Sequence, residues 1–224
     1  MILPHTKKEE KILSDNKNAF VIGVDEAGRG PLAGPVVAGA VWINPEILQK
    51  NFPEKKLIRD SKSLSEKQRK EIFSFMQKSE NFILGFGEVS AETIDEINIL
   101  QATLLAMRLA VEGVVEKLKQ LFPTSTLNNI HLLIDGNQKI KKLNFSQETI
   151  SGGDQSVFSI AAASILAKIH RDDLMEKYHQ QFPFYGFDKH KGYGTTFHLE
   201  QLRKNGPCLI HRRSFKPVRK FFES

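Results

Sequence analysis

The 224-residue sequence has a single cysteine, Cys208, which excludes an intramolecular disulfide and a cysteine-based zinc cluster. Tryptophan is equally scarce, and we expect the one present, Trp42, to lie in the core. No hydrophobic run approaches membrane-spanning length, and the N-terminus lacks the apolar stretch of a signal peptide. These absences predict a soluble protein of the reducing cytoplasm, and nothing in the sequence demands an oligomer, so we expect a monomer.

Acidic residues are outnumbered, because 26 Asp and Glu stand against 32 Lys and Arg, for a formal net charge of +6. Such an excess favours an anionic partner, nucleic acid first, although a soluble basic protein without that partner explains the charge equally well. Hydrophobic residues form 40% of the chain, which is enough for a core, and the length suits one domain with a small appendix.

Apolar runs and helical periodicities alternate along the chain and predict an α/β fold. We expect strands in the two runs of 20–41, which flank a break of glycine and proline, and at 81–89 and 130–134. We expect helices after the capping-box pattern 63–66, and over 90–121, 156–180 and 196–204. The glycine-linked first strand pair favours a mixed sheet over an all-parallel one.

Four acids stand where the local pattern breaks, at strand or helix ends: Asp25, Glu26, Asp135 and Asp154. Crowded carboxylates repel one another, so a site neutralised by cations is favoured. Oxygen ligands without cysteine or histidine in these motifs indicate Mg²⁺ or Mn²⁺ rather than zinc. Two such ions about 4 Å apart would activate a water and stabilise the leaving oxygen in phosphodiester hydrolysis.

Alternatives exist for each of these acids taken singly. Taken singly, Asp135 is better explained as a turn residue and Asp154 as a helix cap, but these explanations weaken when the acids are considered together. Asp25 and Glu26 are neighbours on a strand, so they can serve one site only if the strand breaks at Ala27. The competing pair 172–173 lies more than about 20 Å beyond Asp154 along a straight helix, and we expect it in surface salt bridges.

The loop Gly28-Arg29-Gly30 offers unshielded backbone amides and a guanidinium beside the carboxylates. It could hold a phosphate or a sugar hydroxyl, or could simply turn the chain between two strands. The basic groups 139–142 and 212–220 are explained either as solvated surface or as contacts to duplex phosphates. The scattered histidines show no ligand spacing, so we expect them in surface or core hydrogen bonds.

Several stretches of the sequence resemble those of a known family. The stretch 23–35, Gly-Val-Asp-Glu-Ala-Gly-Arg-Gly-Pro-Leu-Ala-Gly-Pro, is similar to the signature of ribonuclease HII, the type 2 ribonucleases H. Further stretches resemble blocks of that family in the family's order, at 60–65, 97–103, 133–137, 161–168, 190–195 and 211–218. The resemblance thus covers essentially residues 20–220.

The resemblance implies a ribonuclease H-like fold, with a central mixed β-sheet flanked by helices and a C-terminal helical extension. It implies an N-terminal segment at 1–19 that is loosely ordered or a short surface helix, a catalytic domain at 20–182, and a substrate-contacting helical segment at 183–224. The implied enzyme cuts the RNA strand of RNA–DNA hybrids and incises duplex DNA on the 5′ side of a single ribonucleotide, leaving a 3′-hydroxyl and a 5′-phosphate.

The resemblance also assigns roles to residues. The catalytic and metal-binding acids would be Asp25, Glu26, Asp135 and Asp154, which are the four acids found at the pattern breaks. The loop Gly28, Arg29 and Gly30 would recognise the ribose 2′-hydroxyl through its backbone, Tyr193 would stack on the sugar near the RNA-to-DNA junction, and Lys62 would lie near a phosphate.

Two positions depart from many relatives, because Gly152 and Ser63 stand where those relatives have lysine. These departures remove one or two basic contacts near the scissile phosphate and leave the four acids in place. Two alternatives to the implied function stay open: a preference for long hybrids, as in ribonuclease HIII, and a nucleic-acid-binding module without catalysis. The intact set of acids counts against the second.

Overall fold

The computed structural model describes residues 3–48, 50, 52–122 and 127–223, and its centre is a mixed five-stranded sheet. The strands are β1 (Phe20–Ala27), β2 (Val36–Ile43), β3 (Phe82–Val89), β4 (Ile130–Asp135) and β5 (Ser146–Ile150), in the order β3-β2-β1-β4-β5. The β1–β2 and β2–β3 pairs are antiparallel, whereas β1–β4 and β4–β5 are parallel. The expected mixed sheet is confirmed.

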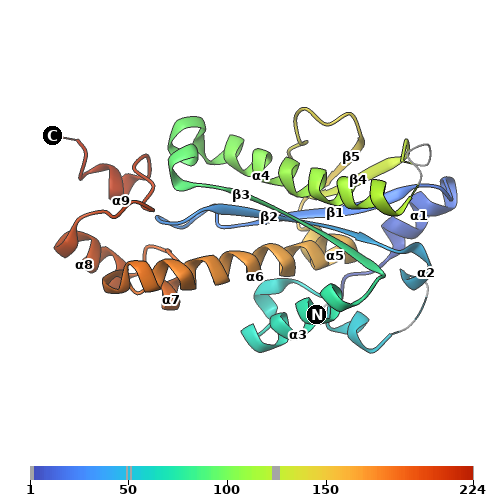
Figure 1. Ribbon diagram of the computed structural model, residues 1–224, viewed down its shortest axis with the longest axis horizontal. Helices are drawn as coiled ribbons and strands as arrows, with labels where there is room; N and C mark the ends of the chain where they lie inside the picture. The colour runs from blue at the N-terminus through green and yellow to red at the C-terminus, as the bar shows by residue number, and fades with distance from the viewer. Residues whose placement is uncertain (1–2, 49, 51, 123–126, 224) are drawn as a thin grey trace.

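Helices cover both faces of this sheet, α4 (Ala91–Leu121) on one side and α6 (Phe158–Gln181) with α3 (Glu66–Lys78) on the other (Figure 1). Glycines in the strands let the helices approach closely. A Cβ at Gly23 would lie 2.2 Å from the carbonyl carbon of Ser159 in α6, and one at Gly87 would lie 1.9 Å from the carbonyl oxygen of Ala106 in α4. The alanine-rich helices therefore pack their backbones directly on the strands.

Helix α4 is interrupted at Asn98, whose φ of 66° and ψ of 162° are not helical. The Asn98 side chain accepts hydrogen bonds from the backbone N–H groups of Leu100 and Gln101, and so caps the second part. By length and composition α4 could cross a membrane, contrary to the expectation that no segment approaches that length. Its buried side chains pack on the sheet, which makes it a core helix in this fold.

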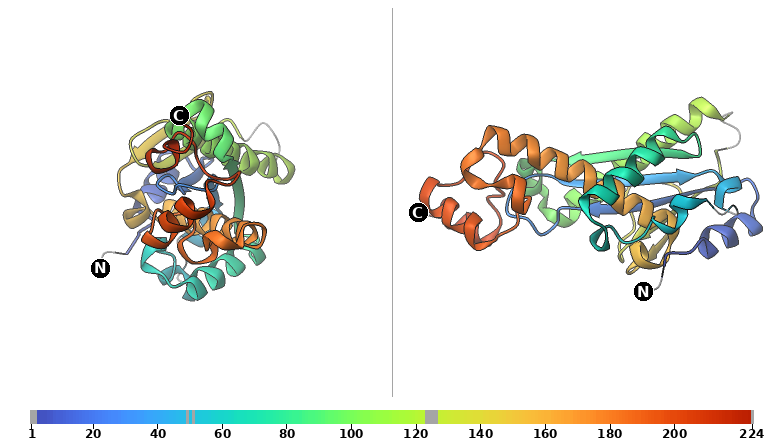
Figure 2. Two further views of the ribbon diagram at one scale, coloured as in Figure 1. Left: turned by 90° about the vertical axis from the view of Figure 1, so that its left-hand side faces the viewer. Right: turned by 90° about the horizontal axis from the view of Figure 1, so that it is seen from below.

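Shorter elements gather at the two ends of the sheet, as Figure 2 shows. At one end, residues 7–15, expected as a loose segment or a short helix, form α1 (Lys7–Asp15). Its Glu9 is buried and accepts the backbone N–H of Ser159. At the other end lie η4 (Pro183–Tyr185), α7 (Phe187–His190), α8 (Thr196–Asn205) and α9 (Lys216–Arg219). The remaining short elements are α2 (Pro45–Leu48), η1 (Pro53–Lys56), η2 (Ser61–Ser63) and α5 (Gly153–Ser156).

Two local predictions differ from the structure. Strand β5 was not expected, because an edge strand reading Ser-Gln-Glu-Thr-Ile lacks the apolar run of a buried one. The capping box of α3 was placed two residues too early: Ser65 and Gln68 form it, while Ser63 belongs to η2. Trp42 is buried as expected.

Candidate active site

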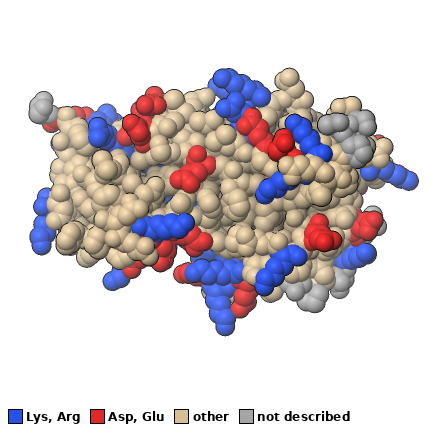
Figure 3. Space-filling model, in the orientation of Figure 1, with Lys and Arg blue, Asp and Glu red and all other residues tan. Residues whose placement is uncertain are grey.

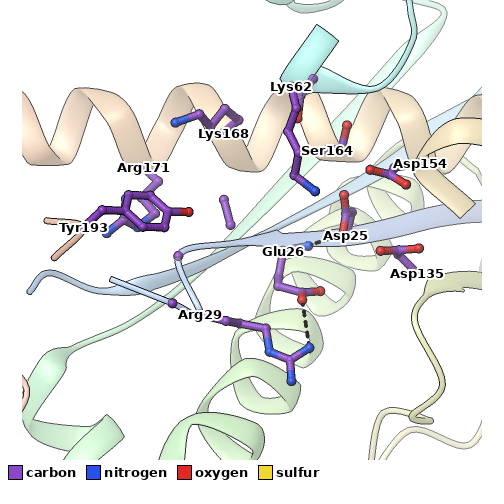
Figure 4. A pocket seen from close by; sticks show the side chains of 14 residues that line it. Asp25, Glu26, Arg29, Lys62, Asp135, Asp154, Ser164, Lys168, Arg171 and Tyr193 are labelled. Atoms are coloured by element: carbon purple, nitrogen blue, oxygen red, sulfur yellow. Dashed lines mark hydrogen bonds and ion pairs between the residues drawn. The ribbon is translucent and has the colours of Figure 1, made fainter. Parts of the chain in front are cut away.

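One pocket collects all nine residues that the sequence singled out. It is lined by Asp25, Glu26, Ala27, Gly28, Arg29, Gly30, Ser61, Lys62, Asp135, Asp154, Ser164, Lys168, Arg171 and Tyr193. They come from the end of β1, the loop after it, η2, the end of β4, α5, α6 and the C-terminal segment (Figure 4). Residues separated by most of the chain therefore meet at the carboxyl ends of the parallel strands β1 and β4.

Asp25 and Glu26 reach the same pocket without a break in the strand. Strand β1 stays paired with β2 through Ala27, so the expectation that it breaks there is wrong. Pairing of β1 with β4, however, stops at Val24 and Ile134. In Figure 4 the two acidic side chains leave β1 in opposite directions. Because the strand edge beyond Val24 is open, side chains on both faces border the same space.

Asp135 and Asp154 complete the acidic wall from the neighbouring elements. Asp135 is the last residue of β4, and its Oδ1 accepts the backbone N–H of Gly153 at 2.7 Å. That contact ties the end of β4 to the first turn of α5, which carries the buried Asp154. Asp154 therefore faces the end of β4 although it lies beyond β5 in the chain.

Burial and mutual repulsion raise the pKa values of three of these acids. The pKa of Asp25 lies well above its ordinary value, first because the carboxyl is desolvated and then because Glu26 and Asp135 are nearby. Desolvation also raises the pKa of Glu26, although the adjacent Arg29 guanidinium opposes the shift. Desolvation and then Asp135 raise the pKa of Asp154. Concentrated negative charge of this kind is stabilised by a cation.

The donor chemistry fits a hard divalent cation such as Mg²⁺ or Mn²⁺. For Asp25, Glu26 and Asp135, the described part of the chain supplies contacts to only one carboxylate oxygen each, so the second oxygen faces the pocket without a protein partner. The acids line the pocket from separate walls, and within the described residues no three of them yet enclose a single position.

The loop after β1 lies beside the acids. Gly28 has a φ of 99°, and a Cβ there would lie 2.1 Å from Nε of Arg171, so both conformation and space require glycine. Arg29 is exposed and its Nη1 lies 3.3 Å from Oε1 of Glu26. The positive charge of this guanidinium is thus held at the entrance of the pocket.

Tyr193 and Lys62 border the pocket on different sides of it, Lys62 at the top and Tyr193 at the left of Figure 4. Tyr193 has 48% of its surface exposed, so its ring can receive a flat or apolar group from solvent. The Lys62 ammonium lies close enough to Asp154 to oppose the rise in that acid's pKa. Its backbone is fixed because its N–H donates to Oδ1 of Asp60.

Sequence reasoning did not assign roles to Ser61, Ser164, Lys168 and Arg171, which also line the pocket. Ser61, Ser164 and Lys168 lie in the stretches 60–65 and 161–168 that resemble family blocks, so the resemblance could have identified them. Asp172, expected at the surface, is buried and forms ion pairs with Lys168 at 2.7 Å and Arg69 at 3.8 Å. The surface prediction was wrong for Asp172 because α6 packs against α3; Asp173 is exposed.

Arg212 also departs from expectation. It was interpreted as a surface residue or a phosphate contact, but it is fully buried behind the loop that follows β1. The group 139–142 is exposed at Lys139, Lys141 and Lys142, so a phosphate contact stays a prediction there. On the face that Figure 3 shows, lysines and arginines are interspersed with acids rather than gathered into one basic patch.

Three histidines of the C-terminal segment lie in its core, as hydrogen-bonded residues. His198 Nδ1 lies 2.9 Å from the carbonyl oxygen of Tyr193 and must donate to it. Its Nε2 therefore accepts from Nε2–H of His211, 3.0 Å away, and His211 Nδ1 accepts the N–H of Cys208. His190 stacks on His198. The neutral pair thus anchors the backbone of Tyr193.

The two departures from the family pattern have local structural counterparts. Gly152 has a φ of 68° in the left-handed region at the N-terminus of α5, where a lysine would be strained. Ser63 ends η2, and its hydroxyl donates to the carbonyl oxygen of Asp60.

Comparison with known proteins agrees with this geometry. The family described as Ribonuclease HII matches residues 22–218. The ribonuclease HII of Endomicrobium trichonymphae is 52% identical over 206 residues, covering 91% of this chain and 89% of that protein. The ribonuclease HII of Chlorobium chlorochromatii is 45% identical over 212 residues, covering 95% and 96%.

Solved structures show the same fold. The ribonuclease H2 of Pyrococcus horikoshii OT3 is similar with a TM-score of 0.60 and 26% identity, over 90% of this chain and 96% of that one. Bst-RNase HIII, solved in complex with Mn²⁺, has a TM-score of 0.70 at 18% identity, over 92% of this chain and 70% of that one. With its ribonuclease H-like sheet and a family match over residues 22–218, this chain belongs to the ribonuclease HII family of ribonuclease H hydrolases.

Proposed function

We propose that this chain is a Mg²⁺- or Mn²⁺-dependent endoribonuclease that cuts the RNA strand of RNA–DNA hybrids and incises duplex DNA on the 5′ side of a single ribonucleotide. The products are a 3′-hydroxyl and a 5′-phosphate. One observation carries the proposal: four carboxylates, a glycine-flanked backbone loop and an exposed tyrosine line the same pocket.

The four acids are the proposed metal ligands and catalytic residues. Asp25, Glu26, Asp135 and Asp154 would hold two divalent ions, and these ions, when bound, supply an activated water and neutralise charge on the leaving oxygen. The protein's own part is to hold the free carboxylate oxygens at the pocket and to fix Asp135 against α5. Lys62, beside Asp154, is placed to contact a phosphate oxygen of the substrate.

Selectivity for ribonucleotides is assigned to the loop and to Tyr193. The 2′-hydroxyl distinguishes RNA from DNA, and the backbone of Gly28, Arg29 and Gly30 would donate to it. The ring of Tyr193 lies beside Gly30, 3.6 Å from where a Cβ there would be, and would stack on the neighbouring deoxyribose. The same proposal places the enzyme in the cytoplasm as a monomer acting on these duplexes.

The test uses a duplex with one ribonucleotide, a matched duplex with an all-RNA strand, and an all-DNA control. The wild type should cut the first on the 5′ side, only with Mg²⁺ or Mn²⁺. Asp135→Asn should lower the rate by at least about 100-fold with duplex binding largely retained, because the substitution removes a ligand charge without changing shape. Asp173→Asn, the same change at an exposed acid of α6, should keep the rate.

Each alternative predicts a different outcome. A preference for the all-RNA strand with little incision at one ribonucleotide would indicate the ribonuclease HIII-like function. Binding without metal-dependent turnover would indicate a module without catalysis. Full activity of Asp135→Asn would show that the assigned acids are wrong.

A further inference from the structure

Arg212 is a buried arginine without a carboxylate partner. It has no exposed surface, and among the residues that the structure describes no acid lies within ion-pair distance of its guanidinium. Burial lowers its pKa to about 9, which leaves it charged at neutral pH. A buried charge is costly unless polar groups compensate it, so the groups that surround Arg212 must offset this cost.

The compensating groups are backbone carbonyls of a single loop. The guanidinium donates to the carbonyl oxygens of Gly28 at 2.6 Å, Arg29 at 3.0 Å, Gly34 at 3.0 Å and Pro35 at 3.2 Å. The planar fork of donors thus turns the carbonyls at both ends of the loop toward the same point. The loop separates Arg212 from the pocket, which Arg212 does not line.

This arrangement fixes where the loop's amides point. In a trans peptide the C=O and the following N–H point in opposite directions, and no peptide bond in the described chain is cis. With the carbonyls of Gly28 and Arg29 held on Arg212, the N–H groups of Arg29 and Gly30 point away from it, toward the pocket. Within the described residues neither N–H has a protein acceptor.

We propose that Arg212 is the positioning residue for ribonucleotide recognition: it turns two backbone N–H groups of the loop, those of Arg29 and Gly30, toward the substrate's 2′-hydroxyl. The proposal rests on the proposed function and explains how the enzyme would select ribonucleotides over deoxyribonucleotides. Arg212 touches no substrate and acts through the orientation of two peptide groups. Arg171 holds the carbonyls of Ala33 and Pro35 as well, but among the described residues only Arg212 donates to those of Gly28 and Arg29, so without Arg212 these two peptides could rotate.

The C-terminal segment is anchored so that Arg212 stays in position. The N–H of Arg212 donates to the carbonyl of Leu32, and the N–H of Gly34 donates to that of Ile210, so the segment pairs with the loop itself. Further on, Asp95 of α4 accepts the N–H groups of Arg213 and Ser214 at 2.8 and 2.9 Å. The segment therefore supports the pocket from behind, in addition to supplying Tyr193 at its front.

The experiment measures discrimination rather than activity. In the Asp135→Asn background, in which cleavage is expected to be slow, the dissociation constant is measured for a duplex with one ribonucleotide and for the all-DNA duplex of the same sequence. The discrimination ratio, the all-DNA dissociation constant divided by the constant for the duplex with one ribonucleotide, reports contact with the 2′-hydroxyl, because every phosphate contact is shared. The variants are Arg212→Met, Arg212→Lys and, as a control, Arg213→Met, whose side chain lies over the Phe222 ring and reaches no loop carbonyl.

Arg212→Met should lower the ratio by about 5- to 30-fold, the factor for one or two neutral hydrogen bonds, with all-DNA binding within about 3-fold of the parent. Arg212→Lys should also lower it, because one ammonium cannot span carbonyls at both ends of the loop. Arg213→Met should leave it unchanged. If Arg212→Lys keeps the same discrimination ratio as the parent, the inference is wrong even if Arg212→Met fails to fold. The inference is also wrong if Arg212→Met loses affinity equally for both duplexes.

Failure of the proposed function has a different signature. In that case the parent itself shows no preference for the ribonucleotide-containing duplex, before any change at Arg212. A parent that discriminates, together with Arg212 variants that discriminate equally well, refutes only the role of Arg212.

Discussion

Removing one charge from the acidic wall should stabilise the metal-free protein and abolish its activity. The perturbation is Asp25→Asn. The wild-type carboxyl is only 5% exposed and lies near Glu26 and Asp135, which together with desolvation raise its pKa well above the ordinary value. Its Oδ1 accepts the N–H of Glu26 at 2.7 Å, and asparagine keeps that acceptor. The substitution therefore removes charge while retaining shape and the backbone contact.

The pH dependence of this effect follows from the raised pKa of Asp25. Ionisation of Asp25 costs more in the folded than in the unfolded protein, so the contribution of the neutral Asp25 carboxyl to stability is fully present below the unfolded pKa and is lost as pH rises through the folded pKa. At neutral pH we expect Asp25→Asn to be about 1–2 kcal/mol more stable, the usual gain from relieving a functional site. For a chain of this length that is a rise in Tm of about 2–8 °C. The difference should vanish near pH 3.

Divalent metal should make the wild type more stable than Asp25→Asn, the reverse of the order expected without metal. A ligand that binds only the folded state stabilises it by about 2.7 kcal/mol at 100 times its dissociation constant, so Mg²⁺ should raise the wild-type Tm and leave Asp25→Asn nearly unchanged. Thermal unfolding with EDTA and with Mg²⁺, at pH 3 and pH 7.5, measures all four conditions. The reasoning is refuted if Asp25→Asn melts below the wild type at pH 7.5 in EDTA.

Two further predictions concern the loop and the histidine pair. Gly28→Ala should lower stability by about 1–3 kcal/mol and weaken ribonucleotide discrimination, because it places a Cβ on Arg171 at a φ of 99°; Gly206→Ala, at a φ of 72° with nothing within 4 Å, should cost only about 1 kcal/mol. Denaturant midpoints and the binding ratio check both, and equal losses would contradict the steric argument. Burial lowers the pKa values of His198 and His211 to about 4, so their stabilising contribution is complete above the unfolded pKa of about 6.5 and is lost as pH falls toward 4. His198→Gln should make the denaturant midpoint depend less on pH across that range. An unchanged pH dependence would show that the histidine pair is not responsible.

The sequence by itself determined the fold class and singled out nine of the residues that line the pocket. Acids at the ends of apolar runs are conspicuous because an unpaired carboxylate does not belong in a buried strand, and Asp25 and Asp135 were identifiable for that reason. The helix periodicities likewise reflect which faces are buried, so α3, α4, α6 and α8 were located to within a few residues. The polar edge strand β5 lacked such a signal.

Only the tertiary structure decided how those residues act together. Glu26 shares the pocket with Asp25 because β4 stops pairing with β1 at Val24, and strand pairing between distant segments is not written in either segment alone. Arg212 looked like one more surface arginine, since nothing in its local sequence reveals that four carbonyls from a loop near the N-terminus surround it. Local residue chemistry is a property of the sequence, whereas burial and the direction of a peptide group depend on contacts between segments far apart in the chain.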